Sequence, residues 1–297
     1  MYHELRKEGT SGGFKLRALV HCTALITSLL LAAPASAQDN GTTTDDNCKR
    51  ASFKVLIDVG HTPDDPGAIS AHGNPEYSYN LALADVAMRQ LQDAGFRQTS
   101  LLMMKGKGYG QLAERAAITN RASPDLFLSI HHDSTREPYI RRWQFAGVDR
   151  NYSDKFSGHS LFVSIRNRHY KQSVAFAKLI GRELLEAGLQ YTPQHAEDIP
   201  TARKPLIDAE LGVYRYDNLV VLKDTRVPAV LFEAGLIINR KDELVLATAE
   251  RRALLAKSIT NAVTRYCESA QAKPSTAAPL FRPGKPTAAK RNGARRG

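Results

Sequence analysis

The sequence predicts an α/β fold, a single domain with a mostly parallel central sheet flanked by helices on both faces. Three observations predict it. Short, continuous apolar runs, typical of strands buried on both faces, recur along the chain. The longer segments between them repeat their apolar residues at helical spacing, and such alternation is typical of a parallel sheet covered by helices. Residues 49–267 contain no internal repeat and no linker, so one domain accounts for all of these elements.

The expected elements follow one another in a regular order. Strands are predicted at residues 53–58, 101–104 and 125–130, and helices at 80–94 and 112–122. Further strands are predicted at 160–164, 219–222 and 229–232, with helices at 174–187 and within 242–267. The polar, proline-containing segment 190–215 is interpreted as an insertion at the rim of the functional site.

Residues 1–37 have the features of a secretory signal peptide. Basic residues precede the apolar run 18–31, and Ala-Ser-Ala at 35–37 is a small-x-small cleavage site. An uncleaved membrane anchor is the alternative, but the run is shorter than a full span. The mature chain is expected to begin near Gln38, with residues 38–50 as a flexible leader. No later stretch is long and apolar enough to cross a bilayer. The signal peptide predicts an exported protein, and the short signal together with the lack of wall-binding repeats favours the periplasm.

The C-terminal segment 269–297 is predicted to be a basic, disordered tail, because it is rich in Ala, Pro, Lys and Arg and has little to bury. From residue 268 onward there are seven Lys or Arg and one Glu, a net charge of +6 out of +11 for the chain. Charge concentrated in an exported tail argues against a nucleic-acid partner. Anionic wall polymers or lipid headgroups are candidate partners, and a solvated spacer is an equal alternative.

Two cysteines, Cys48 and Cys267, flank the predicted catalytic domain at residues 51–268. In an oxidising compartment they are candidates for a disulfide that ties the two ends of the domain together. Two independent thiols are the alternative, because the sequence does not give their separation in space.

Chemically active side chains follow three predicted strands: His61, His131 and Glu233. The carboxyl ends of parallel strands meet at one edge of a sheet, where doubly wound folds place their sites. Glu76 lies in the loop that leaves the first strand. Two imidazoles and one carboxylate form a standard hydrolytic zinc set that leaves a position for water, whose pKa zinc lowers to about 7. Glu233 suits the transfer of that water's proton to a leaving amine.

Each of these residues also has a purely structural interpretation. A single histidine after a strand is usually a hydrogen-bonded structural residue, and Glu76 alone suits a helix start. His72 and His132 are competing ligands, although His132 should point to the opposite side of its strand from His131. Asp58 is expected to orient a ligand histidine through a hydrogen bond.

Four separated segments, taken in order, resemble the zinc-dependent N-acetylmuramoyl-L-alanine amidases of the amidase-3 family. They are Val55-Leu-Ile-Asp-Val-Gly-His-Thr-Pro-Asp-Asp-Pro-Gly-Ala68, Glu76 with Asn80-Leu-Ala-Leu-Ala84, the segments 112–120 and 125–131, and Val227-Pro-Ala-Val-Leu-Phe-Glu-Ala-Gly235 with Asn239. The resemblance spans residues 53–265. Thr62-Pro63 and His132-Asp133-Ser134 depart from the usual pattern without removing a ligand.

The resemblance implies one zinc ion held by His61, Glu76 and His131, with Glu233 as the catalytic base. It implies cleavage of the amide bond between N-acetylmuramic acid and L-alanine in the stem peptide of peptidoglycan. Peptidoglycan and a protein activator are therefore the candidate partners. A zinc peptidase acting on stem peptides and a non-catalytic wall-binding protein that kept the fold are the alternative functions.

Overall fold

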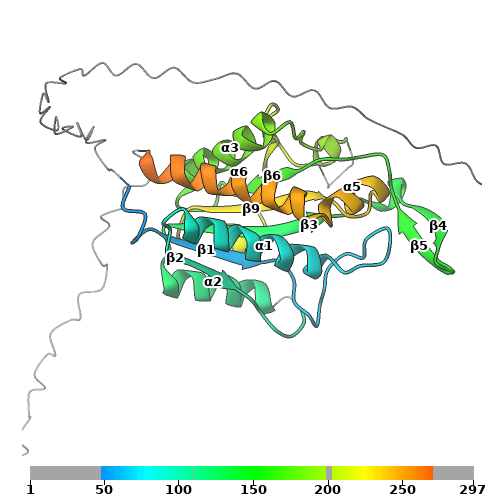
Figure 1. The fold of residues 1–297 in the computed structure, drawn as a ribbon, viewed down its shortest axis with the longest axis horizontal. Coiled ribbons are helices and arrows are strands. Elements are labelled where there is room, and N and C mark those ends of the chain that lie inside the picture. Colours follow the sequence, from blue (N-terminus) through cyan, green and yellow to red (C-terminus); the bar gives the residue numbers. More distant parts are fainter. Residues whose placement is uncertain (1–47, 109, 199–202, 270–297) are drawn as a thin grey trace, which may run out of the picture. The chain divides into compact units, whose positions relative to one another are not determined.

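The computed structural model describes residues 48–108, 110–198 and 203–269 (Figure 1). The predicted signal peptide, most of the leader and nearly all of the basic tail lie outside these residues. Within the described ranges, no helix combines the length and the apolar character that a membrane crossing requires.

A seven-stranded sheet forms the centre of the domain, in the order β2-β1-β3-β9-β6-β8-β7. Its strands are β1 (Lys54–Val59), β2 (Gln98–Leu102), β3 (Leu126–Asp133), β6 (Ser160–Val163), β7 (Leu206–Asp208), β8 (Val213–Arg215) and β9 (Ala229–Leu236). The pairs β1–β2, β1–β3, β3–β9 and β6–β8 are parallel, whereas β6 runs antiparallel to β9 and β7 to β8. The expectation of a mostly parallel sheet is confirmed.

Helices cover both faces of the sheet, also as expected. Three long helices, α1 (Glu76–Asp93), α3 (Tyr170–Glu186) and α6 (Ala249–Glu268), pack on one face, and Figure 1 shows α1 and α6 side by side across it. The opposite face carries α2 (Gly110–Ala122) and α4 (Val220–Lys223), while α5 (Arg240–Leu246) follows β9. A hydrophobic core lies on each face of the sheet, and successive side chains of β1 point alternately into one core and the other. Ile57 packs with the α1–α3–α6 layer and Leu56 with the α2–α4 layer.

Burial on both faces explains why the central strands have continuous apolar sequences. Ile57, Leu128, Ile130 and Val230 are completely buried, and burial of each such side chain contributes about 1.5–3 kcal/mol. The parallel strands β1, β3 and β9 end at the same edge of the sheet, so this rigid centre positions whatever follows them.

One local prediction is wrong and one element was missed. The strand predicted at residues 219–222 is instead the short helix α4, which begins at Val220. A four-residue apolar run fits either state, and here Val221 and Leu222 are buried by a single helical turn. The hairpin of β4 (Arg141–Phe145) and β5 (Val148–Tyr152) was not expected. Its two-residue turn has positive φ at Ala146 and Gly147, and Ala-Gly is a weaker turn signal than Asn-Gly.

The segment 190–215 is more than an insertion, because β7 and β8 within it extend the sheet beyond β6. Its 3-10 turn, Pro193–Ala196, does lie at the rim of the candidate site, since Gln194 and His195 contact Asp133 at the end of β3.

A disulfide joins Cys48 to Cys267 with a Cα–Cα distance of 5.2 Å. Cys48 is buried, and Arg50 pairs with Glu268 at 2.7 Å. Residues 48–50, which the sequence assigns to the flexible leader, therefore pack against the domain.

Candidate metal centre

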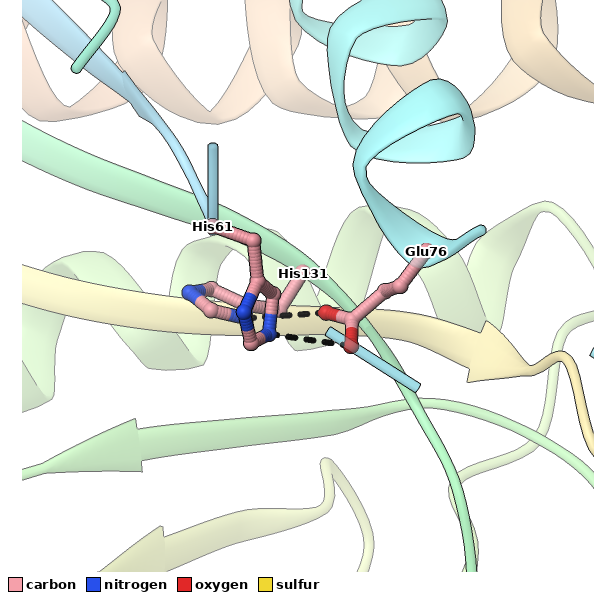
Figure 2. A group of neighbouring side chains, drawn as sticks. All are labelled: His61, Glu76 and His131. Carbon is pink, nitrogen blue, oxygen red and sulfur yellow. Dashed lines mark hydrogen bonds and ion pairs between the residues drawn. The ribbon is translucent and has the colours of Figure 1, made fainter. Parts of the chain in front are cut away.

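His61, Glu76 and His131 come together at the carboxyl edge of the sheet (Figure 2). Glu76 bridges the two rings: its Oε2 lies 3.0 Å from His61 Nε2 and its Oε1 lies 3.0 Å from His131 Nδ1. The candidate ligand atoms all lie within 4.8 Å of one another. Tetrahedral zinc with bonds near 2.1 Å separates its ligand atoms by about 3.4 Å, so the three residues fit a zinc ion with small adjustments.

The loop between β1 and α1 is shaped by these side chains. A methyl group on Gly60 would meet the His131 ring at 2.4 Å, and one on Gly67 would meet both Glu76 and His61 at 2.5 Å. His61 itself has φ of 66°, in the left-handed region that non-glycine residues rarely adopt. Such backbone strain is typical of residues that must aim a side chain into a site.

The three side chains influence one another's protonation. Burial by itself lowers the pKa of His61, but the hydrogen bond and charge of Glu76 raise it above the ordinary value. Burial by itself raises the pKa of Glu76, but hydrogen bonds from His131 and His61 lower it well below the ordinary value. Glu76 is only 4% exposed and stays ionised at neutral pH, so it offers a charged ligand.

Asn80 holds Glu76 in place from one turn further along α1. Its Nδ2 donates to Glu76 Oε1 at 3.2 Å and to the Gly60 carbonyl at 3.1 Å, while its Oδ1 lies 2.8 Å from His132 Nδ1. Burial lowers the pKa of His132 to about 3, so this ring is neutral. His132 therefore turns toward α1, away from the ligand cluster, as the strand alternation predicts. The role of Asn80 was not predicted, although its i, i+4 spacing from Glu76 was a usable signal in the sequence.

Asp58 does not orient a histidine, so that expectation is wrong. Its carboxylate pairs with Arg115 and accepts a 2.7 Å hydrogen bond from Ser129 Oγ. Arg115 also donates to the carbonyl of Val59 at 2.7 Å and to that of His61. This buried pair thus fixes the backbone of the ligand loop, and it does so from α2, a helix that the sequence did not connect with the site.

Glu233 lies next to His131, because the two residues are paired in the register of the parallel strands β3 and β9. Adjacent strands are about 4.8 Å apart, so their side chains are neighbours on one face. Burial and the negative charges of Asp133 and Glu76 raise the pKa of Glu233 well above its ordinary value. Its Oε2 is buried without a hydrogen-bond partner. The carboxyl group is therefore poised to hold a proton next to the candidate ligands.

His72 is not part of the ligand cluster. Its Nδ1 lies 2.5 Å from Glu243 Oε2, and its ring packs against Trp143 and Phe145 of the hairpin. Glu243 is 1% exposed and also accepts hydrogen bonds from Ser70 Oγ at 2.6 Å and Tyr79 OH at 2.9 Å. This network fastens the ligand loop to α5.

A sheet edge with two imidazoles, one ionised carboxylate and a second, protonatable carboxylate has the donor set of a metal-dependent hydrolase. Comparison with known sequences agrees with that class. Residues 55–265 match the family of N-acetylmuramoyl-L-alanine amidases, and the chain belongs to this family.

Individual relatives show how far the similarity extends. The chain is 27% identical over 223 residues to N-acetylmuramoyl-L-alanine amidase AmiA of Salmonella typhimurium, covering 71% of this chain and 75% of that protein. It is also 27% identical over 227 residues to AmiA of Escherichia coli, with the same coverage. Among solved structures, the amidase Ami1 of Mycobacterium smegmatis superposes with a TM-score of 0.55 at 20% identity, covering 73% of this chain and 97% of that one. The last similarity supports the fold.

Proposed function

We propose that this chain is an exported, zinc-dependent amidase that hydrolyses the bond between N-acetylmuramic acid and L-alanine in peptidoglycan. The observation that carries the proposal is the grouping of His61, Glu76 and His131 beside Glu233, in a chain that belongs to the N-acetylmuramoyl-L-alanine amidase family.

In this proposal, His61 Nε2, His131 Nδ1 and the Glu76 carboxylate hold the ion. Zinc, when bound, supplies a Lewis acid for the amide carbonyl and lowers the pKa of water. Glu76 contributes one negative charge, and Asn80 keeps its Oε1 oriented by the hydrogen bond at 3.2 Å.

Glu233 moves the protons. In its ionised form Glu233 accepts a proton from the attacking water at its unpartnered Oε2, and the protonated carboxyl group then delivers that proton to the departing alanine nitrogen. The amide C–N bond breaks, and the carbonyl carbon of the lactyl group on the sugar gains the hydroxyl oxygen of the water. The peptide leaves with a free amino terminus. The low-dielectric surroundings that raise the pKa of Glu233 favour the form that donates to the amine.

Location and partners belong to the same proposal. The Cys48–Cys267 disulfide supports an oxidising compartment outside the cytoplasm, consistent with the signal peptide expected at residues 1–37. We assign the periplasm as that compartment. The basic tail at 269–297 binds anionic wall polymers or lipid headgroups in this account. A protein activator is also part of this proposal. The CwlD amidase of Clostridioides difficile, a structural neighbour, was solved in complex with the GerS lipoprotein.

Replacement of Glu233 by glutamine tests the assignment of the base. The variant should lose activity by about 10²–10⁴-fold, the usual contribution of a general acid–base group, while its zinc affinity stays within a few-fold of the parent. Glu137→Gln is the matched control, because Glu137 is exposed in the short turn after β3. A Glu233→Gln variant that digests peptidoglycan as fast as the parent would remove Glu233 from the mechanism.

A further inference from the structure

A cavity adjoins the metal centre, between the β4–β5 hairpin and the ligand loop that joins β1 to α1. Its volume is about 520 Å³. Ala68 on its wall donates its backbone N–H to Glu76 Oε2 at 3.1 Å, and Ser134 on another wall follows directly after β3, the strand that carries His131. The cavity therefore begins where the ligand cluster ends.

The hairpin contributes two arginines to this cavity, Arg142 and Arg150. Neither forms an ion pair with any carboxylate in the part of the chain that the structure describes. The Arg150 guanidinium lies against the backbone of Gly73, and its Nε is buried without a hydrogen-bond partner. Asp149 also lines the cavity, but its carboxylate accepts a hydrogen bond from Gln144. Two guanidinium groups without an ion-pair partner among the described residues are a ready site for a carboxylate.

The hairpin is held firmly enough to present these groups. Trp143 Nε1 donates to the Ala71 carbonyl at 3.1 Å, and the Trp143 ring packs against His72 with a centroid distance of 5.2 Å. Arg240 covers the Tyr152 ring at 3.9 Å and pairs with Asp154. Figure 1 shows the hairpin of β4 and β5 projecting from the body of the domain.

The proposed substrate carries a carboxylate at a suitable place. In a stem peptide, L-alanine supplies the nitrogen of the cleaved bond. The next residue is a glutamate whose amino group is joined to the alanine and whose side-chain γ-carboxyl group is joined to the third residue. Its α-carboxylate is therefore free. Each residue spans about 3.3–3.6 Å, so this carboxylate lies roughly 7 Å from the reacting carbon. Ala68 both contacts Glu76 and lines the cavity, so the cavity is the space beside the ligand cluster that this carboxylate would enter.

We propose that this cavity is a specificity subsite that binds the free α-carboxylate of the second stem-peptide residue through Arg142 and Arg150. The inference rests on the proposed amidase function. In this proposal the hairpin selects stem peptides by the charge of their second residue. The ligand cluster and Glu233 perform the hydrolysis itself.

Two synthetic muramyl peptides that differ only at this group test the proposal, one with the free acid and one with the carboxamide. The zinc-loaded parent should prefer the acid by about tenfold in kcat/KM, mainly through a lower KM. Arg142→Gln and Arg150→Gln should each lose most of this preference by cleaving the acid more slowly. Arg141→Gln is the matched control, because Arg141 lies on the same hairpin but donates to the Pro138 and Ile140 carbonyls.

The outcomes separate this inference from the proposed function. Equal cleavage of both substrates by the parent, or an unchanged preference in folded Arg142→Gln, would overturn the subsite while leaving the amidase intact. Cleavage of neither substrate would count against the amidase. Calorimetric titration with L-alanyl-D-glutamate and with its α-carboxamide, each with the γ-carboxyl group capped as an amide, then tests the cavity alone. Acid-selective binding that both arginine variants lose would support the subsite, and equal binding of acid and amide would refute it.

Discussion

Replacing Gly60 with alanine should displace a metal ligand without changing any ligand. The new methyl group would lie 2.4 Å from His131 Nε2, whereas ordinary contact begins near 3.4 Å, so the ring must retreat by about 1 Å. Metal–ligand distances tolerate only about 0.2 Å. A shift of that size disturbs the 3.0 Å contact of its Nδ1 with Glu76. We expect zinc affinity to fall by about 100-fold and the apoprotein to lose about 1–3 kcal/mol from overpacking.

Competition with a chromophoric chelator measures the affinity, and urea unfolding of the apoprotein measures the stability. Gly110→Ala is the control, because Gly110 begins α2 and a methyl group there meets nothing within 4 Å. This variant should bind zinc like the parent and gain up to about 1 kcal/mol, since glycine is a poor helix residue. A Gly60→Ala protein with parental zinc affinity would refute the placement of His131 in the centre.

Three further predictions concern the scaffold around the site. Burial raises the pKa of Glu243, but the hydrogen bonds it accepts lower it below the ordinary value. Its contribution to stability is therefore present above the unfolded pKa of about 4.5 and lost as the pH falls below it. The stability gap between the parent and Glu243→Gln should therefore stay constant from pH 7 to about pH 5 and narrow as the pH falls below 4.5 in urea unfolding. A gap that is still unchanged at about pH 3 would contradict this. Removal of one partner from the buried Asp58–Arg115 pair, as in Arg115→Met, should cost about 3–5 kcal/mol, and a loss below 1 kcal/mol would show that the pair is not what fixes the loop. Replacement of both Cys48 and Cys267 by serine opens a closed loop of 219 residues and should lower the free energy of unfolding by about 4 kcal/mol, whereas an unchanged urea midpoint would count against a structural role.

The parts of the fold that were predictable are those with one dominant local signal. The runs that became β1, β3 and β9 are continuous and apolar because both faces are buried, so the strands could be located, and with them His61, His131 and Glu233. Their ends were less well predicted, because β3 continues to Asp133 and β9 to Leu236. Because parallel strands have their carboxyl ends at one edge of a sheet, these residues could also be predicted to lie close together.

The remaining features depend on contacts between segments far apart in the sequence. Arg115 contacts the ligand loop from α2, 54 residues after His61. No local sequence pattern predicts the hydrogen bond between Arg115 and the His61 carbonyl. The partners of Asp58 were mistaken for the same reason. Residues 219–222 have apolar side chains that suit strand or helix, and the layer beneath α4 decides between them. The hairpin arginines were missed because the β4–β5 turn has a weak sequence signal.

Digestion of purified peptidoglycan by the zinc-loaded protein lacking residues 1–37, followed by mass spectrometry, tests the central claim most directly. The account predicts release of intact stem peptides with free L-alanine amino termini, abolished by a chelator and restored by zinc. Shortened peptides that remain attached to sugar would identify a peptidase, and zinc-loaded protein that binds the wall but releases nothing would contradict a catalytic role.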